Sequence, residues 1–473
     1  MNSGQKEVGR RRAGQNQNQR RVDNTGVAPA VKNQAKSNPG VAMKSYDATP
    51  PTSVGYGTTR VRKREIKENT PPTAQVSAQG RAVATTNATA TDVGREYIRV
   101  KVAPDRIMIV LILLLVCIGS VVVFSASYPY ALSQGLDSYY YVRRQIVFVA
   151  LGLFVMAVIM RLPYTLIKRC APIVYGVAFL LLIVVLFIGV SEGAARRWIY
   201  ISGIGITIQP SEIMKAGLVM MLAWYIDRRA EDIQKGAPTK RRLIYGVIVP
   251  GAFIIAACAL VLLEKHLSGT LILFAIGAVV MFIGGSSVGW MSVIFGTLCI
   301  SAGTAYLFSN PYALQRVLTF LDENADKLDE EWQTYQGLLA IGSGGLFGLG
   351  LGESRQKFSY ISQPQNDFIF TIWCEEMGYI GAIAVILIFI VFIWRGFTIA
   401  MRAPDTFSSL TVFGIISHVA IQAILNVAVV TDTIPNTGIS LPFFSYGGSS
   451  LMILLAEMGV VLSISRYSRQ RKL

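Results

Sequence analysis

Three connections between apolar stretches gather most of the charged side chains that could do chemistry. They span residues 191–215, 264–270 and 353–376. Ionisable groups at the edge of a membrane are costly to desolvate, so each one needs a structural partner or serves a site. Clustered cations suit a phosphate-bearing substrate, and a carboxylate beside them suits proton transfer.

The first connection supplies cations. Arg196 and Arg197 stand side by side, and arginine forks match diphosphate oxygens. Glu212 and Lys215 are spaced to share one face of a helix. Two interpretations follow: Lys215 joins the arginines in a cationic cradle for a phosphate, or Glu212 and Lys215 form an ion pair that fixes the start of the helix.

The second connection is a short turn that carries Glu264, Lys265 and His266. Charges so close to hydrocarbon need partners, so Glu264 either pairs with Lys265 or another helix end, or serves the site. The sequence has only two histidines, His266 and His418, and its five cysteines are scattered. We therefore predict no disulfide framework and no metal site built from histidine or cysteine.

The third connection ends in Asp367, directly ahead of an apolar helix. An aspartate there is either the helix N-cap or a base. Glu375 and Glu376 lie two turns further along, and helical geometry puts Glu375 about 80° around the helix from Asp367 and Glu376 opposite. At most one of them can share the site of Asp367, and we choose Glu375.

Composition indicates a membrane protein. Hydrophobic residues make up 52% of the 473 and charged residues 15%, an apolar excess above what a soluble domain can bury. We predict an all-α integral membrane protein with about ten transmembrane helices and a large extracytoplasmic loop, about 309–366, between helices 7 and 8. The expected spans lie near 106–128, 144–160, 171–190, 211–227, 243–263, 268–284, 287–308, 368–394, 408–430 and 447–465.

Lys and Arg fall mostly in connections on one side of these spans, which predicts that this side and both termini are cytoplasmic. The three connections described above then lie on the extracytoplasmic side. Within the long loop, residues 334–352 hold seven glycines. We predict a re-entrant or interfacial segment there. Its glycines either let the backbone approach a lipid head group or serve helix packing.

The chain begins with a basic tail. Residues 1–106 hold 19 Lys and Arg against 8 Asp and Glu. We predict that residues 1–104 are disordered and cytoplasmic, able to touch anionic membrane lipids, because they have almost no large apolar side chains. Since this charge lies in a tail rather than a groove, no nucleic acid is expected as a partner. Residues 105–468 form the membrane domain, and 469–473 are a second short basic tail.

Three ordered motifs resemble the SEDS family of shape, elongation, division and sporulation proteins. They are RRW with IQPSE..K at 196–215, QNDFIF with CEE.G at 365–378, and P.TG..LPF.SYGGSS at 435–450. The resemblance covers residues 105–468. The basic tail and the motif details favour the division (FtsW) or sporulation (SpoVE) branch over the elongation branch (RodA).

The resemblance implies an inverting peptidoglycan glycosyltransferase of the bacterial cell membrane. Such proteins polymerise lipid II into glycan strands, release undecaprenyl diphosphate, and work with a class B penicillin-binding transpeptidase and, in cell division, the divisome. The family's outer-loop aspartate matches Asp367, the expected catalytic base. In the 264–270 turn the chain departs from the family's usual acid pair, so only Glu264 is carried over. The family's other polar positions match Arg197, Trp198, Gln209, Glu212 and Lys215.

In the expected mechanism Asp367 takes the proton of the acceptor hydroxyl. The leaving diphosphate would be stabilised by Arg196, Arg197, Lys215 and Lys265. A divalent cation, Mg²⁺ or Mn²⁺, stays open because the sequence shows no complete ligand set. Two alternatives are a lipid II flippase or transporter, which predicts midplane polar groups and broken helices in both halves, and a non-catalytic scaffold for the transpeptidase.

Overall fold

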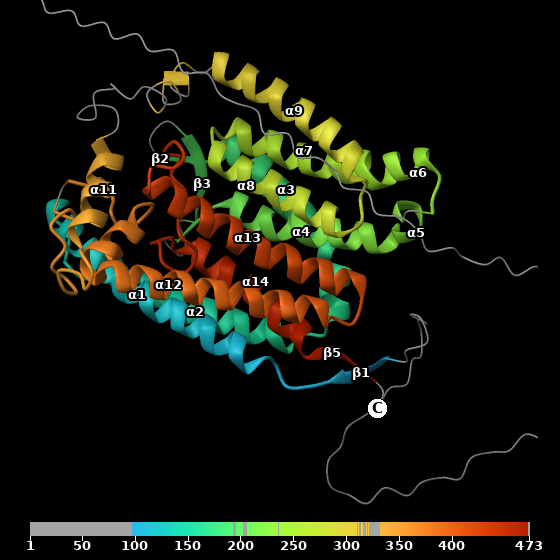
Figure 1. The fold of residues 1–473 in the computed structure, drawn as a ribbon, viewed down its shortest axis with the longest axis horizontal. Helices are drawn as coiled ribbons and strands as arrows, with labels where there is room; N and C mark the ends of the chain where they lie inside the picture. The colour runs from blue at the N-terminus through green and yellow to red at the C-terminus, as the bar shows by residue number, and fades with distance from the viewer. Residues whose placement is uncertain are drawn as a thin grey trace, which may run out of the picture. The chain divides into compact units, whose positions relative to one another are not determined.

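The computed structural model describes residues 97–471, apart from 193–194, 202–205, 235, 359 and most of 310–331. This part of the chain is a bundle of helices lying side by side (Figure 1). The helices are α1 (Arg106–Ser133), α2 (Tyr140–Arg161), α3 (Tyr164–Ile188), α4 (Pro210–Arg228), α5 (Ala230–Ile233), α6 (Thr239–Leu243), the π-helix η1 (Ile244–Ile248), α7 (Val249–Leu263), α8 (Leu267–Ile283), α9 (Val288–Ser309), α11 (Trp332–Ser343), α12 (Ile369–Met401), α13 (Thr406–Val430) and α14 (Ser449–Ser465). The strands are β1 (Tyr97–Lys101), β2 (Val190–Glu192), β3 (Ala195–Ile201), β4 (Ile206–Ile208) and β5 (Tyr467–Arg471).

Seven helices in the described ranges are long and apolar enough to cross a membrane: α1, α2, α3, the continuous helix Thr239–Leu263, α9, α12 and α13. The shorter α8 and α14 are also apolar. Together with α4, they coincide with the remaining expected spans. The helical, multi-span fold predicted from the sequence is therefore confirmed, while the count of ten spans and the long outer loop stay predictions. Residues 321–331, which hold most of that loop's acids, lie outside the described part.

The connections between helices alternate between two ends of the bundle. One end, here called the site end, carries α11, β2 and β3 (Figure 1). The other, here called the basic end, carries α5, α6, β1 and β5. At the basic end Lys168 binds Asp227 (Nζ to Oδ2, 2.6 Å) and Asp405 (3.2 Å), and Arg395 binds Asp105. The first two pairs tie α3, α4 and α13 together, and the third ties α12 to the start of α1.

Two small sheets were not predicted. β1 pairs antiparallel with β5, and β2, β3 and β4 form a three-stranded antiparallel sheet in the first charged connection. The predicted limit of the disordered tail at residue 104 is therefore wrong for residues 97–101, which gain backbone partners from the other end of the chain. The rest of that tail, 1–96, lies outside the described residues.

The glycine-rich segment packs on a break in α12. Gly378 interrupts that helix with φ +65° and ψ −167°, a conformation that glycine adopts without strain. Residues 344–352 supply backbone partners there; Leu349 N, for example, donates to Glu375 O (3.0 Å). A Cβ on Gly348 would lie 2.1 Å from a backbone oxygen of α12. The glycines thus permit backbone-to-backbone packing, which supports the packing interpretation.

α13 is the central helix of the described bundle. Of the seven spans it has the largest buried share, 61% of its apolar window. It contacts α4, α8, α12 and α14. Polar side chains on α13 therefore face protein and must find partners there.

Candidate active site

Asp367 lies directly before α12 at the site end, half-buried. The N-cap position of α12 is Phe368, and no side chain caps the helix, so the structure does not support the N-cap interpretation of Asp367. Burial raises the pKa of its carboxyl to about 6, although the charge of Arg197 lowers it. Oδ2 faces Gly438, where an added Cβ would come within 3.1 Å of it. Gly438 also has φ +66°, so a side chain at that position is disfavoured both by the backbone conformation and by the nearby carboxylate.

Asn426 of α13 fixes the backbone around this carboxylate. Its Nδ2 donates to the carbonyl oxygens of Asp367 (2.8 Å) and Ile439 (2.6 Å). Nearby, Tyr446 N donates to Gln365 O (2.8 Å). The segment before α12 and the segment before α14 are therefore joined twice, directly at Gln365 and through Asn426 at Asp367.

Arg197, on β3 in the first connection, links the turn of the second connection to Asp367 in the third. Its Nη2 donates to Lys265 O (2.7 Å). Its positive charge also acts on the carboxyls of Asp367 and Glu264. Arg196, the preceding residue of β3, is exposed. The pairing of β2 with β3 shifts register here, so that Ser191 pairs with Arg196 and Val190 with Trp198, and Arg197 is the extra residue of a bulge. The structure thus brings Arg197, Glu264, Lys265 and Asp367 together, while the place of Arg196 in the site stays a prediction.

The turn between α7 and α8 places three polar side chains differently. Glu264 is 1% exposed, and within the described part of the chain its carboxylate oxygens have no hydrogen-bond partner. Burial raises its pKa to about 8 against the charge of Arg197. Lys265 is exposed, with φ 56°. Burial also lowers the pKa of His266 to about 4, so its ring is neutral and its Nδ1 lies 3.5 Å from Gln209 Nε2.

Glu212 and Lys215 form the ion pair that was one of their two predicted roles. Lys215 Nζ lies 2.8 Å from Glu212 Oε2, and Lys215 is 4% exposed. The same ammonium donates to Gln422 Oε1 on α13 (3.2 Å). Lys215 therefore belongs to a buried network rather than to an open cradle with the arginines, and its role in binding substrate stays a prediction.

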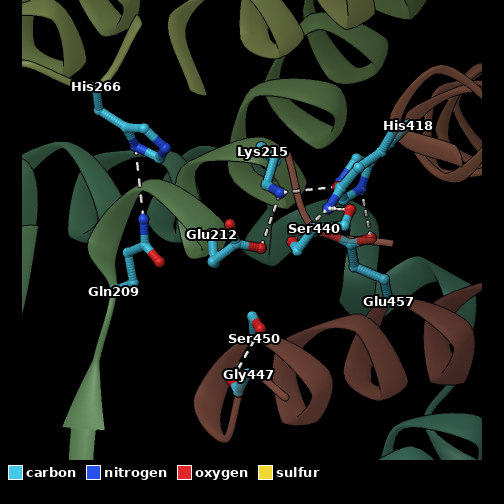
Figure 2. A network of polar contacts seen from close by, with 10 residues as sticks. Gln209, Glu212, Lys215, His266, His418, Ser440, Gly447, Ser450 and Glu457 are labelled. Atoms are coloured by element: carbon cyan, nitrogen blue, oxygen red, sulfur yellow. Dashed lines mark hydrogen bonds and ion pairs between the residues drawn. The ribbon is translucent and has the colours of Figure 1, made fainter. Parts of the chain in front are cut away.

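That network continues into the bundle, as Figure 2 shows. His418 Nε2 lies 2.8 Å from Gln422 Oε1, and His418 Nδ1 lies 3.0 Å from Glu457 Oε2. Gln422 Nε2 donates to the backbone and side-chain oxygens of Ser440 (3.0 and 3.1 Å). The sequence analysis did not single out these residues. The available signal was the spacing of His418, Gln422 and Asn426, which puts three polar groups on one face of an apolar helix.

Glu375 and Glu376 both hold the loop before α12 rather than Asp367. Glu375 accepts hydrogen bonds from Ser354 Oγ (2.5 Å) and Arg355 N (2.9 Å). Glu376 binds the buried ammonium of Lys357 (2.8 Å). The structure shows Glu375 as an anchor of this loop, so the substrate-binding role given to it stays a prediction.

Comparison with known proteins decides the family. Residues 105–470 match the family model FtsW/RodA/SpoVE, described as "Cell cycle protein". The chain belongs to the FtsW/RodA/SpoVE family. Stage V sporulation protein E of Bacillus subtilis (strain 168) is 38% identical over 372 residues, which cover 78% of this chain and 99% of that protein. The "Probable peptidoglycan glycosyltransferase FtsW" of Geobacter sp. (strain M18) is 35% identical over 369 residues, covering 77% and 97%.

Solved structures agree with this assignment to the FtsW/RodA/SpoVE family. Rod shape determining protein RodA of Thermus thermophilus matches with a TM-score of 0.57 at 27% identity, over 77% of this chain and 97% of that one. A chain from a structure described as the coordination of polymerization and crosslinking by a peptidoglycan synthase complex matches with a TM-score of 0.63 at 26% identity, over 77% and 98%. The family predicted from the three motifs is confirmed. Segments of all three motifs meet at the site end.

Proposed function

We propose that this protein is a peptidoglycan glycosyltransferase of the bacterial cell membrane that polymerises lipid II in cell division or sporulation. The Geobacter relative is named as a probable peptidoglycan glycosyltransferase, and the Bacillus relative as a sporulation protein. Both are covered nearly end to end by this chain. The proposal carries over the activity of the family and assigns it to the residues at the site end.

The observation that carries the proposal is the placement of Asp367. Its carboxylate is half-buried beside Gly438, its backbone is held by Asn426, and its pKa is raised to about 6. Such a group is ionised at neutral pH and still a better base than an ordinary aspartate. Asp367 takes the proton of the C4 hydroxyl of the acceptor sugar while that oxygen attacks the anomeric carbon of the growing strand. The bond to undecaprenyl diphosphate breaks with inversion.

Arg197 is the cation whose charge acts on this base, and its guanidinium contacts the backbone of Lys265. We assign both residues to the leaving diphosphate. Arg197 is half-buried and Lys265 is exposed, so both can meet a lipid head group that arrives from the membrane surface. Fixed positive charge there stabilises the diphosphate as the bond breaks. Glu264 lies in the same cluster as a buried carboxyl that is mostly protonated at neutral pH. Arg196 is assigned an outer contact to the same substrate.

The sequence leaves a divalent cation, Mg²⁺ or Mn²⁺, open, and its presence stays a prediction. In the described ranges no three His, Cys, Asp or Glu side chains gather to hold a metal ion by themselves. The steps proposed here are those assigned to the side chains of this chain.

The orientation and the partners belong to the same proposal. Lys168, Arg395 and the ends of the membrane domain lie at the basic end, so the positive-inside rule favours that end and both termini as cytoplasmic and the site end as extracytoplasmic. A class B penicillin-binding transpeptidase is the proposed partner, supported by the likeness to a chain of a peptidoglycan synthase complex. Divisome proteins and membrane lipids are the further expected contacts.

The proposal is tested with purified full-length protein in liposomes or micelles. Fluorescent lipid II is supplied with and without the transpeptidase partner, and glycan strands are resolved by gel electrophoresis. Strands that appear with the protein, and not with boiled protein, support the proposal. If no strands form in either condition while the folded protein binds lipid II, the glycosyltransferase assignment fails.

A further inference from the structure

The buried network of Figure 2 contains groups that the proposed mechanism does not use. His418 and Glu457 face each other between α13 and α14, and both side chains are nearly inaccessible, at 5% and 3% exposed. On its other side Glu457 borders a crevice among α2, α3, α4, α13 and α14, whose described lining is otherwise apolar or sulfur-bearing. Within the part of the chain that the structure describes, His418 is thus the polar side chain that Glu457 contacts.

The hydrogen bonds of Gln422 fix its orientation. The Lys215 ammonium can only donate, so it requires the amide oxygen of Gln422. The Ser440 carbonyl can only accept, so it requires the amide nitrogen. Both needs are met by one orientation of the amide. In that orientation the amide oxygen also faces His418 Nε2 at 2.8 Å, so Nε2 must carry a hydrogen.

The hydrogen on His418 Nε2 also limits how Nδ1 of the same ring can contact Glu457. When His418 Nε2 carries a hydrogen, Nδ1 has two ways to meet Glu457 Oε2 at 3.0 Å. Nδ1 is protonated against a carboxylate, or it accepts from a protonated carboxyl. In both cases one proton lies between His418 and Glu457. Without it, a lone pair would face a carboxylate inside the bundle, which is unfavourable.

We propose that the His418–Glu457 pair is a positioning device: it supports, from a third side, the orientation of Gln422 that Lys215 and Ser440 require, and so helps Gln422 to hold the Lys215 ammonium near the reaction site. Lys215 is the cation that connects this device to the site, because its charge acts on His266, which the charge of Arg197 also reaches. Glu457 is thus a positioning residue, two hydrogen-bond partners removed from Lys215. The inference rests on the proposed function, and it adds the buried charge of Lys215 to the cations that stabilise the lipid diphosphate.

Two substitutions of Glu457 separate orientation from packing. In Glu457→Gln the amide N–H can donate to His418 Nδ1, so the Nε2–H form of His418 and the orientation of Gln422 are kept. In Glu457→Leu the ring keeps Gln422 but loses the partner of Nδ1, so the Nε2–H form is no longer selected from that side, and a ring with its hydrogen on Nδ1 sets Nε2 against the oxygen of Gln422. We expect Glu457→Leu to raise the KM for lipid II roughly tenfold with little change in kcat, and Glu457→Gln to restore most of that loss.

The double variant with Lys215→Met gives the decisive comparison. If Glu457 acts through Lys215, Glu457→Leu adds no further loss to Lys215→Met. Equal defects in Glu457→Gln and Glu457→Leu, or a Glu457→Leu defect that persists in the Lys215→Met background, overturn the proposal and leave only a packing role.

A spectroscopic measurement keeps this test independent of polymerisation. The chain has only two histidines, so ¹⁵N-histidine labelling gives two ring spin systems, which His266→Asn assigns. We expect a protonated His418 Nε2 in wild type and in Glu457→Gln, and its loss or exchange in Glu457→Leu. An unprotonated Nε2 in wild type overturns the proposal. If wild type forms no glycan strands, the proposed function fails, and binding of undecaprenyl diphosphate by the same variants still tests the positioning.

Discussion

The raised pKa of Asp367 predicts how polymerisation depends on pH. Burial moves this pKa from 3.8 to about 6. A base acts in its ionised form, and a group of this pKa is ionised in about one tenth of molecules at pH 5 and about nine tenths at pH 7. The value of kcat/KM should therefore rise roughly tenfold between these pH values and then level off. An aspartate with its ordinary pKa would be ionised in over about 90% of molecules at pH 5, and the rate would stay almost flat.

Substitution of Arg197 tests the same prediction in a second way. Its charge lowers the pKa of Asp367, so Arg197→Gln should move the half-maximal pH upward, whatever it does to substrate binding. The matched control is Arg143→Gln, which removes an exposed arginine paired with Asp137 at the site end (3.1 Å), and it should leave the half-maximal pH unchanged.

The assay is the initial rate of glycan formation from fluorescent lipid II between about pH 4.5 and pH 8.5. The partner's transpeptidase centre is blocked with penicillin, so that crosslinking does not enter the signal. Melting temperatures at each pH show that the protein stays folded. A half-maximal rate near pH 4 in wild type, or an unchanged half-maximal pH in Arg197→Gln, would refute the reasoning.

Three further predictions concern stability and positioning. Burial raises the pKa of Glu264 from 4.5 to about 8, so the native state prefers the protonated form, and stability should fall as pH rises from about 4.5 to about 8; Glu264→Gln should flatten that fall in melting temperature, and an equal slope in both proteins would contradict it. Asn426→Ala should lower kcat roughly tenfold by releasing the Asp367 backbone, yet should have no added effect on Asp367→Asn, as measured by polymerisation rates. Lys357→Met leaves the buried Glu376 without its cation and should cost about 3–5 kcal/mol of unfolding free energy; thermal unfolding should show recovery when Glu376→Gln is added, and no recovery would argue against the pair.

Much of the fold follows from the sequence because hydrocarbon imposes simple constraints. Each expected apolar run coincides with a described helix, from α1 to α14, since a span needs about 20 apolar residues whatever its neighbours are. The break in α12 at Gly378 was not predicted. A single glycine inside an apolar helix also fits ordinary helix packing, and the partner backbone at 344–352 is far from obvious in a linear sequence.

The site residues that belong to a recognised motif could be predicted from the sequence. The role of a residue that depends on its contact with another helix could not. Asp367, Arg197 and Glu264 were candidates from the sequence, and the structure brings them to one cluster. Residue spacing left two roles open for Lys215. Lys215 contacts Glu212 and Gln422 because of the way α4 packs against α13, and a local sequence pattern does not predict that packing.

The sheet in the first connection explains why the places of Arg196 and Arg197 could not be told apart from the sequence. The strands β2 and β4 have three residues each and lie in a glycine-rich stretch, so their local preference is weak. The pairing of β2 with β3 nevertheless contains a bulge at Arg197, the arginine whose charge acts on Asp367. Bulges redirect side chains, and nothing in the motif distinguishes the bulged arginine from its neighbour.

The central claim is that Asp367 is the base for lipid II polymerisation, and one measurement tests it most directly. The rate of glycan formation at saturating lipid II is compared for wild type, Asp367→Asn and the control Asp137→Asn, with lipid II binding followed in parallel. The account predicts a rate lower by about 10²–10⁴-fold in Asp367→Asn with binding retained, and an active control. Polymerisation by Asp367→Asn at the wild-type rate would contradict it. A wild-type protein that moves lipid II across liposomes without forming strands would instead be a transporter.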